Sequence, residues 1–479
     1  MTDLPGDRFE HPLTERYASR EMAQLFSPRS RHGRWRDLWI ALAEAEHELG
    51  LDITAAQLAE LRQARDLFDF ARVAQLEKEL RHDVMAHIHH YGELAPAAKG
   101  ILHLGATSCF VTDNGDLLLY REGLRQLEQR LVRACAALAA FARQWRAEPC
   151  LGYTHFQPAQ PVTVGKRATL WLFDLLLDLD EVRRVIAWLP ARGVKGTTGT
   201  QASFLALFDG DHAKVQELER RVMHKVGFTR WVAVSGQTYT RKLDWTIHQV
   251  LCGIAQSAAK FGCDLRLLAH EGEVEEPSES KQVGSSAMAY KKNPMRAERI
   301  CSLARYVIAA TTTSAATAAT QWLERTLDDS AVKRIALPES FLACDAILIL
   351  VENVAKGLVV WPKVVAQNLA QELPFMATEE ILMAAVRKGG DRQQLHERIR
   401  VHSRAAAHQI KAEGRPNPLL GLIGGDPAFA GIVPLLAELV APQRFVGRSP
   451  QQVDEFLAAE VEPRLRGSGA SGGGDELRV

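Results

Sequence analysis

A long apolar stripe between residues 243 and 268 constrains the fold of this chain more than any other feature. Its members recur at intervals of three and four for about seven turns, which is the period of an α-helix that buries one face. They are Leu243, Ile247, Val250, Ile254, Ala258, Phe261, Leu265 and Leu268. A helix of this length needs partners of similar length to cover its stripe, so the sequence predicts a bundle of long helices.

Four further segments have the same pattern. The first follows the pair Asp113-Asn114, expected to cap it, and stops before Pro149; the others cover about 163–189, 296–322 and 338–356. Alternating strand patterns are scarce, the best being 231–235, and neither Gly-rich nucleotide-binding motif occurs. The expected fold is all-α. A long central helical bundle (111–360) is flanked by two smaller helical domains (1–110 and 361–479), the second with a Gly/Ser-rich tail.

Composition limits which classes of partner the protein can bind and which cellular compartment it occupies. The 479 residues carry 58 basic and 58 acidic side chains, and this balance argues against nucleic acid or an acidic membrane as a broad partner. A local cluster of Arg and Lys is still compatible with a net charge of zero. The seven cysteines form no C-x-x-C pair, which favours a reducing compartment. No apolar signal or membrane-length segment occurs, so a cytoplasmic protein is expected.

The segment 284–295, GSSAMAYKKNPM, is the most informative motif. It follows an acidic stretch with Pro and Ser between two predicted helices, so it is predicted to be a long loop. Composition alone allows either a solvated connector or a site with hydroxyls, backbone N–H groups and positive charge. The segment is similar to the signature loop of the fumarase/aspartase superfamily, G-S-S-x-M-P-x-K-x-N-P. The longer string 285–305 resembles the adenylosuccinate lyase family, although Ala289 stands where the pattern has proline.

The resemblance extends along nearly the whole chain through further motifs in the same order. These are RYAS (16–19), RHDVMAHIH (81–89), HLGATS (103–108), GYTHFQPAQPVTVGKR (152–167), RGVKGTTGTQASF (192–204), GQTYTRK (236–242), QWLERTLDDSAVKR (321–334) and QELPFMATE (371–379). It implies a fumarase/aspartase-like fold, no cofactor, and a homotetramer whose active sites each draw on three subunits. The implied reaction is β-elimination of fumarate from adenylosuccinate, giving AMP, and from succinylaminoimidazole-carboxamide ribotide, giving AICAR, in purine nucleotide biosynthesis.

Such a reaction needs a base, an acid and a basic cradle for two carboxylates and a phosphate. The resemblance implies that Ser285 is the base, with Ser286 as close competitor, and that His155 is the acid. His82 and Lys291 are implied to assist. Arginine suits the cradle because its planar fork pairs with carboxylate and phosphate oxygens. The implied substrate contacts are Arg16, Tyr17, Arg81, Asp83, Thr107, Ser108, Thr154, Gln237, Asn293, Arg299, Arg325, Ser330 and Arg334.

Three alternatives compete with this interpretation. Asp83, His87 and His90 fall at i, i+4 and i+7, the spacing of metal ligands on one helix face. Three ligands on one helix rarely complete a tetrahedral site, so no metal is expected and the histidines are expected to be surface or packing residues. A sister lyase such as argininosuccinate lyase would not need cations for a phosphate. A non-catalytic structural protein on the same scaffold is disfavoured by the presence of both Ser285 and His155.

Overall fold

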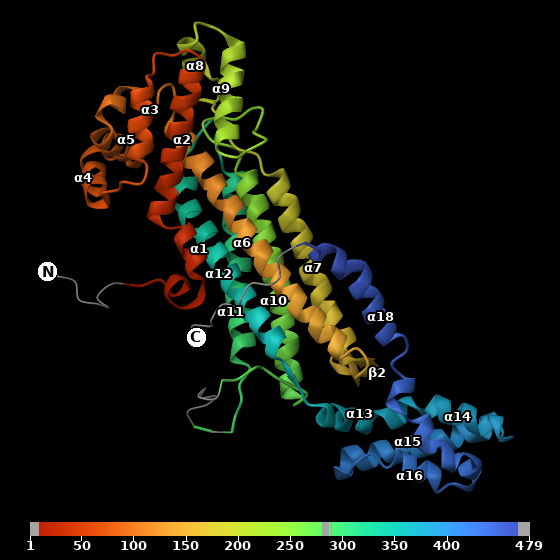
Figure 1. Cartoon of the computed structure of the whole chain (residues 1–479). Coiled ribbons are helices and arrows are strands. Elements are labelled where there is room, and N and C mark those ends of the chain that lie inside the picture. The colour runs from red at the N-terminus through yellow and green to blue at the C-terminus, as the bar shows by residue number, and fades with distance from the viewer. Residues whose placement is uncertain (1–8, 280–286, 289, 468–479) are drawn as a thin grey trace.

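The computed structural model describes residues 9–279, 287–288 and 290–467. Five long helices lie side by side along an elongated molecule, with smaller helices gathered at each end (Figure 1). The long helices are α6 (Ser108–Gln144), α7 (Val164–Trp188), α10 (Lys242–His270), α11 (Met295–Ala319) and α12 (Asp329–Gly357). The predicted all-α class and the central bundle are confirmed. No helix in the described ranges is both long enough and apolar enough to cross a membrane.

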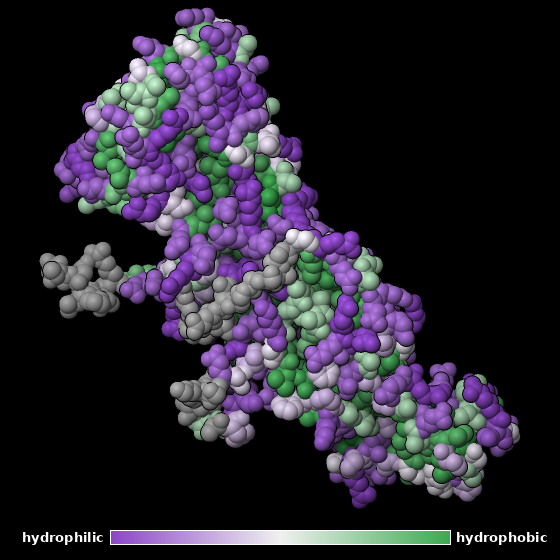
Figure 2. Space-filling model, viewed as in Figure 1, coloured by the Kyte–Doolittle hydropathy of each residue, from purple (hydrophilic) through white to green (hydrophobic). Residues whose placement is uncertain are grey.

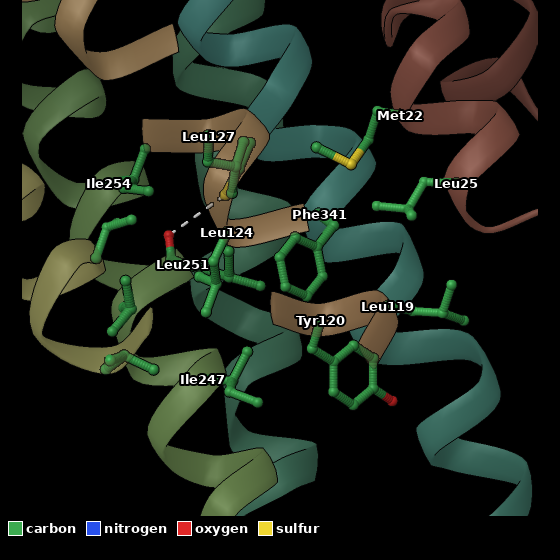
Figure 3. Packing of buried hydrophobic residues seen from close by; sticks show 14 of the residues in the cluster. Met22, Leu25, Leu119, Tyr120, Leu124, Leu127, Ile247, Leu251, Ile254 and Phe341 are labelled. Atoms are coloured by element: carbon green, nitrogen blue, oxygen red, sulfur yellow. Dashed lines mark hydrogen bonds between the residues drawn. The ribbon is translucent and has the colours of Figure 1, made fainter. Parts of the chain in front are cut away.

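The predicted stripe of α10 lies inside the bundle. α10 packs against α7, α11 and α12, and α6 packs against α7 and α12. Figure 3 shows Leu251 of α10 beside Leu124 of α6 and facing Phe341 of α12, and the rings of Phe341 and Tyr120 stack with their centroids 5.9 Å apart. A Cβ at Gly123 would lie 2.9 Å from the Phe341 ring, so the glycine allows α12 to approach α6 closely.

The start of α6 differs from the prediction. The helix begins at Ser108, with Thr107 at the N-cap position, so Asp113 and Asn114 lie within it and are buried. Their side chains bind other segments instead of capping. The Asn114 Oδ1 accepts hydrogen bonds from the backbone N–H groups of Arg192 (2.9 Å) and Gly193 (3.1 Å). A cap signal in the sequence does not distinguish an amide that ends its own helix from one that holds a distant loop.

Two further expectations are corrected. α12 begins at Asp329, nine residues before the expected start, and Pro338 lies inside it. Burial of Asp329, Lys333 and Leu337 in the added turns accompanies this extension, and such tertiary packing offsets the cost of about 3 kcal/mol of an internal proline. The segment 231–235 is not a strand, since only Trp231 forms an isolated parallel bridge, with Ala191.

One end of the molecule, at the top of Figure 1, is built from short helices and shares its hydrophobic core with the bundle. The π-helical turn η1 (Leu13–Tyr17) and α1 (Arg20–Leu25) do not belong to this end; they lie beside the middle of the bundle, where they pack against α12 (Figure 1). The elements of this end are α2 (Pro28–Glu48), α3 (Ala55–Gln63), α4 (Phe70–Leu80), α5 (Asp83–Leu94), the 3-10 helix η2 (Pro96–Ile101), α8 (Ala202–Leu207) and α9 (His212–Lys225).

The other end has a separate core and two small sheets. Strands β1 (Pro149–Thr154) and β2 (Gln157–Thr163) form an antiparallel hairpin, and β3 (Val274–Glu275) pairs with β4 (Val359–Val360). The second core lies within residues 377–439, while α18 (Ser449–Phe456) returns to pack on α7 (Figure 1). The remaining elements are α13 (Pro362–Met376), α14 (Thr378–Arg387), α15 (Arg392–Glu413), α16 (Leu419–Gly424), η3 (Pro427–Leu435), α17 (Leu436–Leu439), η4 (Pro442–Arg444), η5 (Leu457–Val461) and α19 (Glu462–Leu465).

Candidate active site

A cavity of about 460 Å³ lies where α5, α6 and α12 begin; it is called the main cavity below. Nine residues predicted from the sequence line it together, although they come from four separate motifs. They are Arg81, His82, Asp83, Thr107, Ser108, Gln237, Arg325, Ser330 and Arg334. Arg241 and Lys333 add two further cations, and Glu77, Asp113, Asp116 and Asp329 supply carboxylates. The main cavity is therefore highly charged and rich in hydrogen-bond donors.

The turn between α4 and α5 presents three of these side chains. Arg81 has a left-handed backbone (φ 54°) and ends α4, while His82 caps α5 by accepting the Met85 N–H at Nδ1 (3.3 Å). Because Nδ1 accepts, the proton of the neutral ring is on Nε2, which lies 3.4 Å from the Ser108 hydroxyl. A non-glycine residue in this backbone region is strained, and such strain concentrates at functional sites.

An ion pair joins Asp83 to Arg334 across the main cavity. The guanidinium donates to the carboxylate at 2.6 Å, and the Asp83 side chain is about one-quarter exposed. Burial opposes ionisation of Asp83, but the hydrogen bond and positive charge of Arg334 outweigh it, so the pKa of Asp83 is lowered. Asp83 is therefore anionic at neutral pH and fixes one of the predicted substrate-binding arginines.

A buried polar network forms the floor of the main cavity. Arg241 donates to Asp113 (3.1 Å) and to Asp329 (2.6 Å), and Lys333 donates to the hydroxyl of Tyr239 (2.6 Å). Burial opposes ionisation of Asp113, but Arg241 and Lys333 outweigh it and lower its pKa. The network ties α6 and α12 to the segment before α10, and so fixes the shape of the floor.

The alternative metal site is contradicted by the contacts of its three side chains. Asp83 binds Arg334, and His90 Nε2 accepts the Asp69 N–H at 3.1 Å. The ring centroids of His87 and His32 lie 3.8 Å apart. Burial lowers the pKa of His87 to about 3 and that of His32 to about 4. Within the described residues no group of three His, Cys, Asp or Glu side chains is arranged to hold a metal ion.

His155 lies far from the main cavity, at the tip of the β1–β2 hairpin. Thr154 pairs with Gln157, so His155 and Phe156 are the two central turn residues, with φ values of 54° and 55°. Two successive positive φ angles define a type I′ turn, which usually carries Asn and Gly. The hairpin therefore presents an exposed imidazole on a strained, non-glycine turn.

Lys291 and Asn293 lie between α10 and α11, at the opposite end of these helices from the main cavity. They line a second cavity of about 470 Å³ together with Ala269, Gly272 and residues 274–279. Glu276 anchors this segment, because its carboxylate accepts the backbone N–H groups of Arg296 (2.9 Å) and Ala297 (2.6 Å) at the start of α11. The described residues do not include the predicted base Ser285, the alternative base Ser286, or Ala289, which stands where the family pattern has proline.

Arg16, Tyr17 and Arg299 form a further group. The guanidinium of Arg299 lies 5.6 Å from the centre of the Tyr17 ring and that of Arg16 lies 6.0 Å from it. Tyr17 belongs to η1 and Arg299 to the second turn of α11. The two motifs, nearly 300 positions apart in the sequence, are thus brought together by the packing of α11, α12 and η1.

One chain does not unite these groups. α6 has 37 residues, so at 1.5 Å per residue about 55 Å separate Ser108 at its start from the hairpin that follows its end. α11 has 25 residues, and its length separates Lys291 from Arg325 by about 35 Å. The predicted acid and the signature segment therefore lie tens of ångströms from the main cavity of the same chain.

Several residues of the main cavity are missed by reasoning from sequence, namely Arg241, Lys333, Asp113, Asp116 and Asp329. For Lys333 a signal exists, because it lies three residues after Ser330 and helical spacing puts both on one face of α12. Asp113 and Arg241 are separated by 128 positions, and only the fold reveals that they form a pair.

Comparison with known proteins identifies the family of the chain. Residues 17–309 match the family model described as "Lyase", and residues 374–456 match "Adenylosuccinate lyase C-terminus". The chain is 50% identical to the adenylosuccinate lyase of Saccharomyces cerevisiae over 463 residues (96% of each chain). It is also 50% identical to that of Schizosaccharomyces pombe over 460 residues (95% of each).

Among solved structures, the fold is similar to that of a 3-carboxy-cis,cis-muconate lactonizing enzyme from Pseudomonas putida. The TM-score is 0.80 at 22% identity, covering 94% of this chain and 98% of that one. A fumarate lyase from Mesorhizobium sp. BNC1 has a TM-score of 0.77 at 25% identity, covering 93% and 99%. The matched family models and the yeast relatives lead to one conclusion: the chain belongs to the adenylosuccinate lyase family of the fumarase/aspartase superfamily.

Proposed function

We propose that the chain is a carbon–nitrogen lyase that releases fumarate from adenylosuccinate, leaving AMP, and from succinylaminoimidazole-carboxamide ribotide, leaving AICAR, in purine nucleotide biosynthesis. The observation that carries the proposal is the 50% identity to a curated adenylosuccinate lyase over 96% of both chains. The charged main cavity supports it, because a substrate with two carboxylates and a phosphate needs several cations. A cytoplasmic location is part of the proposal and agrees with seven free cysteines.

The first chemical step removes a proton from the carbon next to a carboxylate, which is a weak acid. The resulting dianion must be stabilised by cations and N–H donors that are already in place. In our proposal Ser285 takes this proton, with Ser286 as the alternative base. A serine hydroxyl becomes basic only when its surroundings favour the alkoxide, and Lys291 in the same segment supplies positive charge for this purpose.

The second step breaks the carbon–nitrogen bond and protonates the departing nitrogen. We assign this proton to His155, because imidazole gains and loses protons near neutral pH. The exposed turn that carries His155 allows the ring to project into a site outside its own chain's bundle. His82 assists from the main cavity, where its Nε2 faces Ser108.

The substrate cradle is proposed to combine the three groups described above. Among the cations of the main cavity, Arg81 is exposed, and the side chains of Arg334 and Arg325 are 50% and 23% exposed, whereas Arg241 and Lys333 are buried. We propose that the three accessible arginines bind the anionic groups of the substrate. Uncharged hydroxyl and amide side chains in the main cavity offer further hydrogen bonds to the substrate; they belong to Thr107, Ser108, Gln237 and Ser330. Arg16, Tyr17, Thr154, Asn293 and Arg299 are proposed to reach the same substrate from other chains.

We further propose a homotetramer in which each active site draws on three subunits. The separation of His155 and Lys291 from the main cavity supports this, because no closure of a loop spans about 35–55 Å. Apolar side chains at the surface support it as well: Leu170, Phe173 and Leu177 on α7 are 44–49% exposed. Figure 2 shows apolar surface along the bundle, and such surface marks interfaces.

Mixing two inactive variants tests the shared site. Ser285→Ala lacks the proposed base and His155→Ala lacks the proposed acid, so each tetramer alone is expected to be inactive. After subunit exchange, some sites combine an intact Ser285 with an intact His155 from different chains, and activity is expected to return. No recovery in a mixture shown by mass spectrometry to contain hybrids would contradict a site shared between these residues.

Release of fumarate from adenylosuccinate, followed by ultraviolet absorbance, tests the function itself. Wild-type protein is expected to be active, and Ser285→Ala and His155→Ala are expected to lose at least about 100-fold in kcat. His408→Asn is the matched control, because this histidine is 73% exposed on α15. Folded wild-type protein that is inactive on adenylosuccinate but splits argininosuccinate would overturn the proposed substrate.

A further inference from the structure

Asp329 is a carboxylate in the floor of the main cavity to which neither the motif nor the proposed reaction gives a role. It is the first residue of α12 and is only 1% exposed. Its Oδ2 accepts from Arg241 Nε at 2.6 Å and from the guanidinium of Arg325 at 3.2 Å. Its Oδ1 has no hydrogen-bond partner among the described residues, although Asp329 lines the cavity. One buried carboxylate thus holds two arginines at once.

Arg241 is the fixed partner in this contact. It is 3% exposed and also donates to Asp113 at 3.1 Å. Burial opposes its charge, but Asp113, Tyr239 and Asp244 outweigh burial and raise the pKa of Arg241 further. Arg325 is the movable partner, because its side chain is 23% exposed and Asp329 is the carboxylate with which it pairs. The fixed pair therefore orients the movable guanidinium.

A second contact joins the same two segments. The backbone N–H of Gln237 donates to the carbonyl of Glu324 at 2.9 Å. A Cβ at Gly236 would lie 2.5 Å from that carbonyl oxygen, so only glycine allows this approach. The segments 236–241 and 324–329 are thus joined by a backbone hydrogen bond at one end and by the Arg241–Asp329 pair at the other.

We propose that Asp329 is a positioning residue of the lyase site, acting through Arg325. It does not contact substrate in this proposal. It holds the Arg325 guanidinium toward the main cavity and keeps the segment that carries Gln237 in register with it. The inference rests on the proposed function, since Arg325 is one of the arginines proposed to bind the anionic groups of the substrate. A misplacement of about 1 Å in such a group lowers kcat/KM by up to about 100-fold.

Asp329→Asn tests this role, because the amide keeps the shape and loses the charge. If Arg325 binds an anion of the substrate in both ground and transition states, KM for adenylosuccinate is expected to rise by about 10-fold or more, with kcat changed less than about 3-fold. Asp328→Asn is the matched control. Asp328 is the neighbouring acid, is exposed, and accepts a hydrogen bond only from Gln321 among the described residues. Wild-type KM is expected for it.

A double variant separates positioning from general stability. Arg325→Ala alone is expected to raise KM, and adding it to Asp329→Asn is expected to raise KM little further, because both changes remove one contact. If the KM increases of the two single variants multiply in the double variant, the two residues act independently and the proposal is overturned. An Asp329→Asn enzyme that melts earlier but keeps the wild-type KM would also overturn it. If Asp329→Asn does not fold, Arg241→Lys removes the Nε donor while keeping the charge. An unchanged KM in the Arg241→Lys variant would likewise overturn the proposal.

The outcomes also separate this inference from the proposed function. Wild-type protein that releases no fumarate overturns both. Active wild-type protein, together with an Asp329→Asn variant that matches Asp328→Asn in KM, overturns only the role of Asp329.

Discussion

Glu46 is a buried residue that contributes to the pH dependence of stability. It lies on α2 with no exposed surface, and neither carboxyl oxygen has a hydrogen-bond partner among the described residues. Burial raises the pKa of Glu46 to about 9. The folded protein therefore holds a proton at neutral pH that the unfolded chain, with an ordinary carboxyl group, releases. Between about pH 4.5 and 9 the native state binds more protons, so this group makes stability fall as pH rises.

Glu46→Gln is expected to remove this dependence, because the amide is neutral at every pH. Its free energy of unfolding should exceed that of wild type by a margin that grows by up to about 1.4 kcal/mol per pH unit in this window. Thermal unfolding at pH 5.5 and pH 8 measures the margin. Glu122→Gln, an exposed residue of α6, is the control and should show no such growth. A Glu46→Gln margin equal at both pH values would contradict a protonated buried acid.

For single residues, the sequence predicts which side chains form the site better than it predicts their conformations and contacts. The motifs identify Arg325, Ser330 and Arg334, and these three do line one cavity. They do not predict that His155 occupies a type I′ turn, because neither His nor Phe is typical of that turn. They also omit Asp329, because the residues that explain it, Arg241 and Arg325, come from two different segments.

Among the secondary-structure elements, α6 connects packing to the site through Asn114. This side chain is fully buried and makes four hydrogen bonds. Its Oδ1 accepts from two backbone N–H groups at 2.9 and 3.1 Å, and its Nδ2 donates to the carbonyls of Phe110 (2.8 Å) and Gly193 (3.1 Å). It therefore holds the segment around residue 193 against the start of α6, beside the main cavity.

Asn114→Ala is expected to destabilise the protein by about 2–4 kcal/mol, because it leaves buried N–H and C=O groups without partners. Urea unfolding monitored by circular dichroism measures the loss. Glu122→Ala on the same helix is the control. Its pair with Arg125 (3.4 Å) is exposed, and a change within about 0.5 kcal/mol is expected. A loss of less than about 1 kcal/mol for Asn114→Ala would show that water replaces these bonds.

Helix boundaries show why elements are only partly predictable. The stripe of α10 is read correctly from 243 to 268, because its period is set by burial against several neighbours. α12 extends past Pro338, and the start of α6 precedes its apparent cap. In both cases distant contacts outweigh a local signal, and a local signal is all that a single sequence offers.

For the whole molecule, the proposed assembly depends on surfaces that no motif specifies. Leu170 and Leu177 lie on α7 and are 47% and 49% exposed. Near the main cavity, Trp322, Leu323 and Leu327 are 71–99% exposed. A pattern of apolar residues predicts that a face is buried, and it does not say whether the covering surface comes from the same chain. For the wide stripe of residues 170–189, the sequence therefore leaves open whether the covering surface comes from the same chain or from another subunit.

Leu170→Glu combined with Leu177→Glu is expected to split the proposed tetramer, because two carboxylates on each α7 would have to be buried without partners in the proposed interface. Sedimentation should show smaller species that keep their helical circular dichroism. Activity should fall with the tetramer fraction, since no single chain unites His155, Lys291 and the main cavity. Val401→Glu on α15, 52% exposed, is the control and should remain tetrameric and active. A fully active, dissociated double variant would contradict a site shared between subunits, whereas a double variant that remains an active tetramer would place the interface on another face.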